Sequence, residues 1–289
     1  ADTFFVAQLG TSAAGAVGIV FSLMAVIQAI GFMLGMGAGN LVSRYLGAKE
    51  QRQADCAAST AFFTALAFGL GITVLGTLFL DPLMRVLGAT PTILPYARDY
   101  ARYILFGAPV MCASFVLNNI LRGEGKAMLA MVGIGLGGVL NIGLDPLFIY
   151  AFGLGIAGAA IATVLAQAVS VVLSLLIIRR RSLPFIMKRE DIQFDKTVIG
   201  RIVKLGSPVA LQDLLVNISF LVIIAIANHM GTIPSAGVGV AEKLCGFVMM
   251  VPSAYGQSMT AFVAQNVGAS REDRARRVLL YGVLSSLAA

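Results

Sequence analysis

The residues best suited to chemistry lie in an apolar stretch, 128–150, that contains Asn141, Asp145 and Pro146. The stretch is long enough to cross a bilayer, which takes about 20 apolar residues. A carboxylate there is costly in hydrocarbon, so it is expected to face the interior of a helix bundle, often on an ion or proton path. Asn141 and Asp145 are four apart and share a helix face, and Pro146 leaves the Ile142 carbonyl without its helical hydrogen bond. These oxygens suit a proton or a small hard cation, although a structural aspartate bonded to a neighbouring helix is the alternative.

Composition places the elements around this stretch in a membrane. Hydrophobic residues make up 58% of the chain and charged residues 12%, and the mean hydropathy is +0.89. Soluble domains carry about 25% charged residues. Three isolated cysteines and a single histidine, His229, argue against disulfides, a metal cluster or a histidine-based catalytic set. The sequence therefore predicts an all-α integral membrane protein that is not an enzyme.

Apolar segments and basic residues predict the helices and their orientation. A partial helix is expected at 1–10, a last one begins near Arg277, and full spans lie at roughly 15–42, 57–80, 97–121, 127–150, 156–178, 199–228 and 233–264. Of 21 Lys and Arg residues, 17 fall in or beside alternate loops, which the positive-inside rule makes cytoplasmic. The net charge of +7 follows from this bias, so no nucleic-acid partner is expected.

An internal repeat without gaps relates the start of the chain to its end. Shifted by 221 residues, Gly10-Thr11 falls on Gly231-Thr232 and Gly47-Ala48 on Gly268-Ala269. Both copies run from an outer loop through a helix into a basic cytoplasmic loop. The repeat is therefore parallel, as in transporters built from two similar bundles.

The repeat predicts two six-helix bundles, about twelve helices in all. The predicted parts are an amino-terminal bundle at 1–178, a cytoplasmic linker at 179–198 and an incomplete carboxy-terminal bundle at 199–289. The start of the first helix and the last helices are thus expected to lie outside this sequence, and residues 1–289 alone are not expected to transport.

Depth brings further polar groups to the level of Asp145. In the predicted orientation Asp145 lies about 8 Å below the outer surface, Thr163 about 10 Å and Asp2 about 12 Å, at 1.5 Å per helical residue. Asp2, Asn141, Asp145 and Thr163 are therefore predicted to form one site. Two carboxylates in a poorly hydrated bundle cannot both be ionised cheaply, so at least one is expected to be protonated in some states of the protein.

Short motifs in a characteristic order carry a family resemblance. They are residues 2–10, Leu46-Gly-Ala-Lys-Glu50, Leu121-Arg-Gly-Glu-Gly-Lys126, Asn141-Ile-Gly-Leu-Asp-Pro146 and Ala264-Gln-Asn-Val-Gly-Ala269. In these motifs the sequence resembles the MATE (multidrug and toxic compound extrusion) family of antiporters, closest to its DinF-type and archaeal branch. The resemblance implies a cation site made by an Asp on the first helix, an Asn and an Asp on the fifth, and a Thr on the sixth. The matching residues are the four that depth selects.

The second bundle departs from the NorM-type pattern of the family, in which a glutamate on the seventh helix binds a cation. Segment 208–220 holds no glutamate, which leaves a second cation site in doubt. Polar residues of this segment and of the next span are candidates for contacts with substrate: Asp213, Asn217, Glu242, Lys243 and Gln257. For Glu242 and Lys243 a packed ion pair is an equal alternative, and Asp213 could also be structural.

Secondary active efflux is the function that follows. The sequence predicts exchange of H⁺ or Na⁺ for amphipathic, often cationic small molecules by alternating access. The protein is expected to be a monomer in the plasma (inner) membrane of a prokaryote, with no cofactor beyond the coupling ion. A lipid-linked oligosaccharide flippase of related fold is one alternative, but its cavity should be basic and only Lys243 lies deep in a span. A non-transporting scaffold is another, and it leaves the buried carboxylates unexplained.

Overall fold

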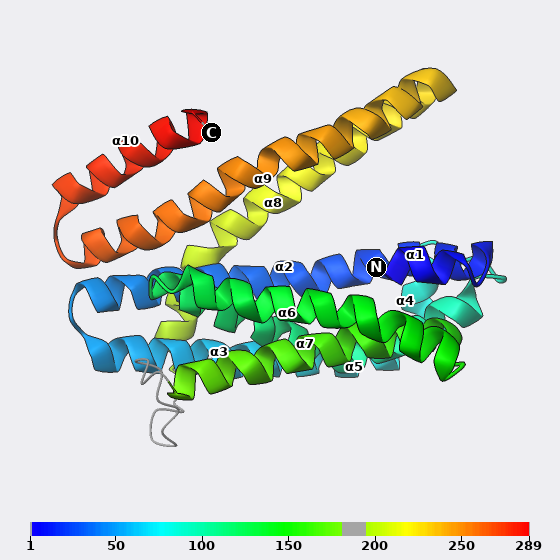
Figure 1. Ribbon diagram of the computed structural model, residues 1–289, viewed down its shortest axis with the longest axis horizontal. Helices are drawn as coiled ribbons and strands as arrows, with labels where there is room; N and C mark the ends of the chain where they lie inside the picture. Colours follow the sequence, from blue (N-terminus) through cyan, green and yellow to red (C-terminus); the bar gives the residue numbers. More distant parts are fainter. Residues whose placement is uncertain (1, 181–194, 289) are drawn as a thin grey trace.

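The computed structural model describes residues 2–180 and 195–288, except the side chains of a few helical residues within those ranges. All regular elements of these ranges are helical (Figure 1). They are α1 (Asp2–Ala7), α2 (Thr11–Gly47), α3 (Gln51–Leu78), α4 (Leu80–Val86), α5 (Leu94–Gly123), α6 (Ala127–Pro146), the π-helical turn η1 (Leu147–Ala151), α7 (Gly155–Arg180), α8 (Lys196–His229), α9 (Thr232–Gly268) and α10 (Glu272–Ala288). Seven spans within the described residues are long and apolar enough to cross a membrane, so the predicted all-α membrane fold is confirmed.

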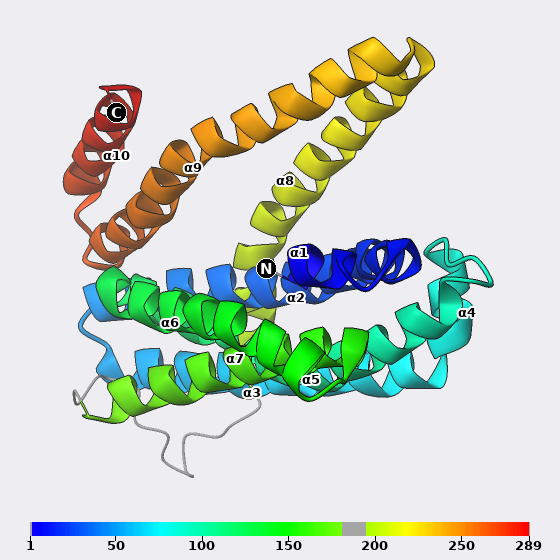
Figure 2. The same cartoon turned by 45° about the vertical axis from the view of Figure 1, so that its right-hand side comes forward.

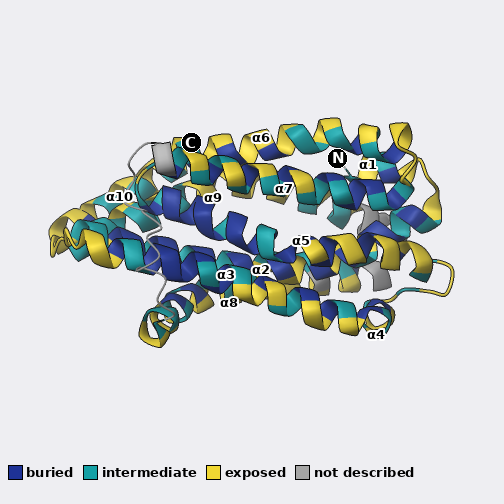
Figure 3. Cartoon of the chain, turned by 90° about the horizontal axis from the view of Figure 1, so that it is seen from below, coloured by how far each residue is buried: buried dark blue, intermediate teal, exposed yellow. Residues whose placement is uncertain are grey.

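Helix α5 is the centre of the first bundle. It packs against α2, α3, α6 and α7, and its buried side chains include Tyr100, Ile104, Leu105 and Leu117. Burial is concentrated where these helices face one another, and exposed residues follow their outer faces (Figure 3). This distribution is expected of helices whose outer faces contact lipid rather than water.

Helices α8 and α9 form an arm that leaves the first bundle. Both pack against α2. From there the two helices lead away from the first bundle and meet at their far ends, while α10 runs back beside α9 (Figures 1 and 2). The predicted linker, 179–198, lies mostly outside the described residues, so the division into two bundles at that point stays a prediction.

Two helices begin earlier than predicted. Helix α2 begins at Thr11, not near residue 15, and α10 begins at Glu272, not near Arg277. Glu272 and Asp273 lie in the first turn of α10, where negative charge is stabilised by the helix dipole. The short helix α4, which lies in an outer loop, was not predicted.

Candidate cation-coupling site

Four helices place polar side chains at one level of the first bundle. Asp2 begins α1, Asn141 and Asp145 lie on α6, and Thr163 lies on α7, so the structure brings together all four residues that the sequence selected. Tyr100 of α5 joins them and is 1% exposed.

Hydrogen bonds join these five residues into one chain. Asp2 Oδ2 accepts from the Tyr100 hydroxyl at 2.8 Å and from the Thr163 hydroxyl at 2.7 Å. Asn141 Nδ2 lies 3.2 Å from Thr163 Oγ1 and 3.2 Å from Asp145 Oδ1, and donates to both. The two carboxyl groups are therefore linked through one hydroxyl and one amide.

Asp145 is the most enclosed of the five hydrogen-bonded residues. Its side chain is fully buried, and its Oδ2 atom has no hydrogen-bond partner among the described residues. An unpaired, ionised oxygen is costly in such surroundings, whereas a protonated carboxyl group lowers that cost. The carboxyl groups of Asp2 and Asp145 can take up protons, and the carboxyl, hydroxyl and amide oxygens gathered here are also of the kind that binds Na⁺.

Local structure explains how α1 and α6 are held at this site. At Pro146 the α-helix gives way to the π-helical turn η1, and such turns are frequent at functional sites. The Tyr150 hydroxyl in this turn lies 2.9 Å from the Phe5 carbonyl oxygen and 2.8 Å from Gln8 Oε1. Tyr150 thereby ties the short helix α1, and with it Asp2, to the outer end of α6.

Two cavities lie along the inner side of this site. The outer one, about 340 Å³, is lined by Asp2, Tyr100, Asn141 and Thr163. The other, about 280 Å³, extends to Arg122 and Gln257. Both cavities share the lining residues Ile134, Gly137, Gly138 and Gln167. The two cavities thus adjoin, and together they extend from Asp2 toward Arg122.

The candidates for substrate contact are dispersed over α8 and α9. Asp213 and Asn217 are exposed, and Asn217 Nδ2 donates to the Asp213 carbonyl of its own helix at 2.8 Å. A cavity of about 490 Å³ on α8 is lined by another face, which includes Leu215 and Phe220. Glu242 is half-buried, and the side chain of Lys243 lies outside the described part of the chain. Gln257 lines a cavity that reaches toward the first bundle.

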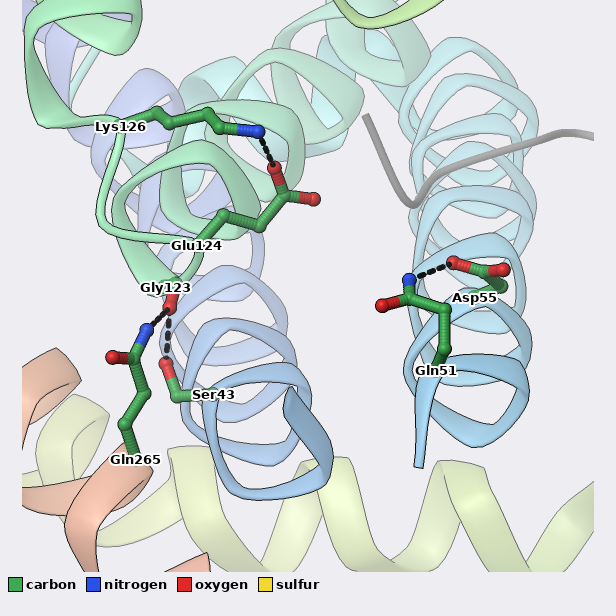
Figure 4. Close-up of polar contacts among 7 residues, drawn as sticks. All are labelled: Ser43, Gln51, Asp55, Gly123, Glu124, Lys126 and Gln265. Atoms are coloured by element: carbon green, nitrogen blue, oxygen red, sulfur yellow. Dashed lines mark hydrogen bonds and ion pairs between the residues drawn. The ribbon is translucent and has the colours of Figure 1, made fainter. Parts of the chain in front are cut away.

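The predicted cytoplasmic ends of α5 and α9 are joined by polar contacts (Figure 4). The Gly123 carbonyl, at the end of α5, accepts from the Ser43 hydroxyl at 2.7 Å and from Gln265 Nε2 at 2.9 Å. Arg122 also donates from Nη1 to Gln257 Oε1. With α8 and α9 diverging from α2 at the other end, these contacts hold the predicted cytoplasmic side together.

Glu124, in the turn after Gly123, should make stability depend on pH. Its side chain is 3% exposed and lies 3.5 Å from Lys126 Nζ. Burial raises the pKa of the Glu124 carboxyl from 4.5 to about 7, against the opposing charge of Lys126. Below pH 4.5 both folded and unfolded states are protonated. Between pH 4.5 and about 7 only the folded state keeps the proton, so stability falls as pH rises, and above that range the loss is complete.

Glu124→Gln should remove that fall, which is on the order of 3 kcal/mol. Thermal unfolding of the full-length protein at pH 5 and pH 8 measures this loss of stability. From pH 5 to pH 8 the melting temperature should fall further in the wild type than in Glu124→Gln. The exposed Glu50 in the preceding cytoplasmic turn provides the control, because Glu50→Gln should keep the wild-type difference. An undiminished difference in Glu124→Gln would contradict the assignment.

Comparison with known proteins supplies the family. A family model described as MatE matches residues 1–147 and 208–289. An FAD transporter of Shewanella oneidensis is 33% identical over 286 residues, which are 97% of this chain and 63% of that protein. The probable multidrug resistance protein YoeA of Bacillus subtilis is 28% identical over 284 residues, 95% of this chain and 61% of that protein.

A solved structure agrees with the fold. The crystal structure of MATE in the straight conformation superposes with a TM-score of 0.88 at 29% identity, over 99% of this chain and 64% of the other. This chain therefore spans less than two thirds of the length of these relatives. Nothing in the comparisons distinguishes the DinF-type branch, which stays a prediction. The family resemblance expected from the sequence is confirmed: the chain is a multi-pass membrane protein of the MatE family.

Proposed function

We propose that the full-length protein exchanges protons for amphipathic, often cationic drugs across the plasma membrane of a prokaryote. One observation carries the proposal: the partly buried hydrogen-bond chain from Tyr100 through Asp2, Thr163 and Asn141 to Asp145, which ends in a carboxyl oxygen without a partner among the described residues. A pair of linked carboxyl groups that shares protons titrates as one unit.

Exchange requires that the coupling ion and the drug favour different conformations. The cytoplasmic contacts and the divergence of α8 and α9 support an outward-open state, in which Asp2 and Asp145 take protons from outside. Loading the site would favour a conformation that no longer holds drug, and reciprocity means that drug would then weaken proton binding. A monomer with no bound cofactor is sufficient for this cycle.

The candidates for substrate contact are Asp213, Asn217, Glu242, Lys243 and Gln257. Acidic groups there would favour cationic drugs, and exposed apolar residues of α8 and α9 such as Leu211, Phe247 and Met250 would contact their rings. Their role depends on the rest of the second bundle.

Export of an anionic dinucleotide is a second candidate. It is favoured by the similarity to an FAD transporter and by the Arg122 guanidinium, which lines the inner cavity and could bind a phosphate group. Drug resistance separates the two functions.

The test is resistance of cells that lack their own exporters and express the full-length gene. Multidrug exchange predicts raised resistance to ethidium and norfloxacin, together with proton-dependent uptake in everted vesicles. Flavin export predicts FAD in the medium without resistance. If the protein is present in the membrane and the cells show neither raised resistance nor FAD in the medium, the proposed transport function is contradicted.

A further inference from the structure

Helix α7 carries a stripe of polar residues that extends beyond the candidate cation site. Between Ile156 and Ile178 its polar residues are Thr163, Gln167, Ser170 and Ser174. Their spacings of four, three and four residues place all of them on one helix face. The opposite face is apolar and exposed, at Leu165, Val169, Val172 and Leu176. Polar groups within a span are expensive and usually functional, and only Thr163 belongs to the site described above.

The inner part of the stripe converges on one glycine of α6. Ser170 and Ser174 are 2% and 1% exposed, and the Ser170 hydroxyl donates to the Gly133 carbonyl at 2.9 Å. A Cβ atom placed on Gly133 would lie 2.9 Å from Ser174 Oγ and 3.7 Å from Asn118 Oδ1 of α5. Hydroxyl groups of α7 and an amide oxygen of α5 thus meet at the same point of α6.

Two of these atoms have no hydrogen-bond partner in the described part of the chain. They are Ser174 Oγ and Asn118 Oδ1, and Asn118 as a whole is 5% exposed. Asn118 donates from Nδ2 to the Ser114 carbonyl at 2.8 Å, which leaves its amide oxygen as the atom nearest Gly133. Leaving a buried polar atom unpaired costs about 1–3 kcal/mol, and such atoms are commonly satisfied by buried water.

We propose that this stripe, together with Asn118, holds a chain of water molecules that carries the coupling proton from the Asp2–Asp145 site to the cytoplasm once the site has closed to the outside. The proposal rests on the proposed function. Along α6, Asn141 lies 14 residues from the predicted cytoplasmic start of the helix, which is about 21 Å at the helical rise. Along α7, the stripe from Thr163 to Ser174 is about 16 Å long, so it spans most of that distance.

The chemistry of the stripe suits a proton. Water molecules held along the stripe pass the proton from one to the next, and each gains a proton as it releases its own, so no group changes its charge and no other reactant is needed. The Ser174 hydroxyl can accept from one water and donate to another, whereas the hydroxyls of Thr163 and Ser170 already donate to Asp2 and to the Gly133 carbonyl and can only accept from water.

Ser174→Ala tests the proposal because the unpaired hydroxyl does not stabilise the fold. If Ser174 is unpaired and only packs, its removal should raise the melting temperature, because a buried unpaired hydroxyl is lost, and should leave transport unchanged. If it belongs to the proton route, drug-driven proton flux should fall about tenfold, the worth of one hydrogen bond, with unchanged melting temperature and ethidium affinity. Ser59→Ala is the matched control, since Ser59 of α3 is also fully buried with an unpaired hydroxyl and lies outside the stripe.

Gly133→Ala tests the same route by filling it. Its new methyl group would take the space between Ser174 and Asn118, and the Ser174 hydroxyl can rotate away at little cost. Gly135→Ala is the control on the same helix, because a Cβ there meets nothing within 4 Å.

The measurement is the signal of a pH dye trapped in proteoliposomes with full-length protein, after addition of ethidium. Slowed proton flux in both Ser174→Ala and Gly133→Ala, with wild-type flux in both controls, supports the route. A wild-type rate in either stripe variant contradicts it, and so does a wild type that exchanges drug for Na⁺ only. If the wild type itself exchanges no ion for drug, the proposed function is overturned together with the route. That outcome differs from failure of the route alone, in which the wild type exchanges protons and a stripe variant does so at the same rate.

Discussion

Asp145→Asn should abolish ion-driven efflux by the full-length protein while leaving ethidium binding measurable. The amide has nearly the size of the carboxyl group and can still receive the hydrogen bond of Asn141, but it cannot take up or release a proton. We expect the rate to fall by at least about a hundredfold, as when a proton-transferring group is lost. Asp2→Asn should have nearly the same effect, because Asp2 Oδ2 joins Tyr100 and Thr163 in the hydrogen-bond chain.

Thr163→Ala is the control within the site, since it removes one neutral group and keeps both carboxyl groups. It should cost less than either aspartate substitution. Equilibrium binding of ethidium to each purified variant shows whether drug is still recognised. Wild-type efflux in both Asp2→Asn and Asp145→Asn would show that the coupling group lies elsewhere in the protein.

Gly47→Ala should force open the contact between the cytoplasmic ends of α2 and α9. A Cβ atom on Gly47 would lie 1.9 Å from the Gln265 carbonyl oxygen, and one on Gly268 would lie 2.0 Å from that of Arg44. Backbone atoms cannot rotate away as a side-chain end can, so the helices must separate. Overpacking of this kind costs about 1–3 kcal/mol, which changes a two-state equilibrium by a factor on the order of ten to a hundred. The outward-open state should lose population, and exchange should slow.

Spin labels at the exposed positions Glu50 and Glu272 measure this opening, once the native cysteines of the full-length protein, among them Cys56, Cys112 and Cys245, are replaced. The distance between the labels should lengthen in Gly47→Ala and in Gly268→Ala. Gly18→Ala is the control on α2, because a Cβ there meets nothing within 4 Å. An unchanged distance distribution in both interface variants would show that α2 and α9 do not hold the cytoplasmic side closed.

The internal repeat relates the two halves of this contact to each other. The shift of 221 residues that relates Gly47 to Gly268 also relates Arg44 to Gln265. The two close approaches are thus copies of each other, as expected of equivalent helices that meet on the axis between two parallel repeats. Sequence identity marks equivalent positions, but only the crossing of the helices decides whether those positions touch.

The residues of the site could be predicted where a shared helix face or an equal depth in the membrane determines their position. Asn141 and Asp145 share a face, and the helical rise places Thr163 and Asp2 at their level. Tyr100 was missed because Tyr96, Tyr100 and Tyr103 lie close together near the outer end of α5, and nothing in their spacing shows which one faces the bundle. The polar stripe on α7 was readable from its spacing, whereas its unpaired partner Asn118 emerges only from the packing of α5 against α6 and α7.

The central claim, that the Asp2–Asp145 site couples proton movement to drug export, is tested most directly by imposing ion gradients separately. Proteoliposomes of the full-length protein are given either a pH gradient without Na⁺ or a Na⁺ gradient at constant pH, and drug movement is recorded. The pH gradient alone should drive ethidium transport in the wild type and fail to do so in Asp145→Asn. Transport driven by the Na⁺ gradient alone, or undiminished proton-driven transport by Asp145→Asn, would contradict the claim.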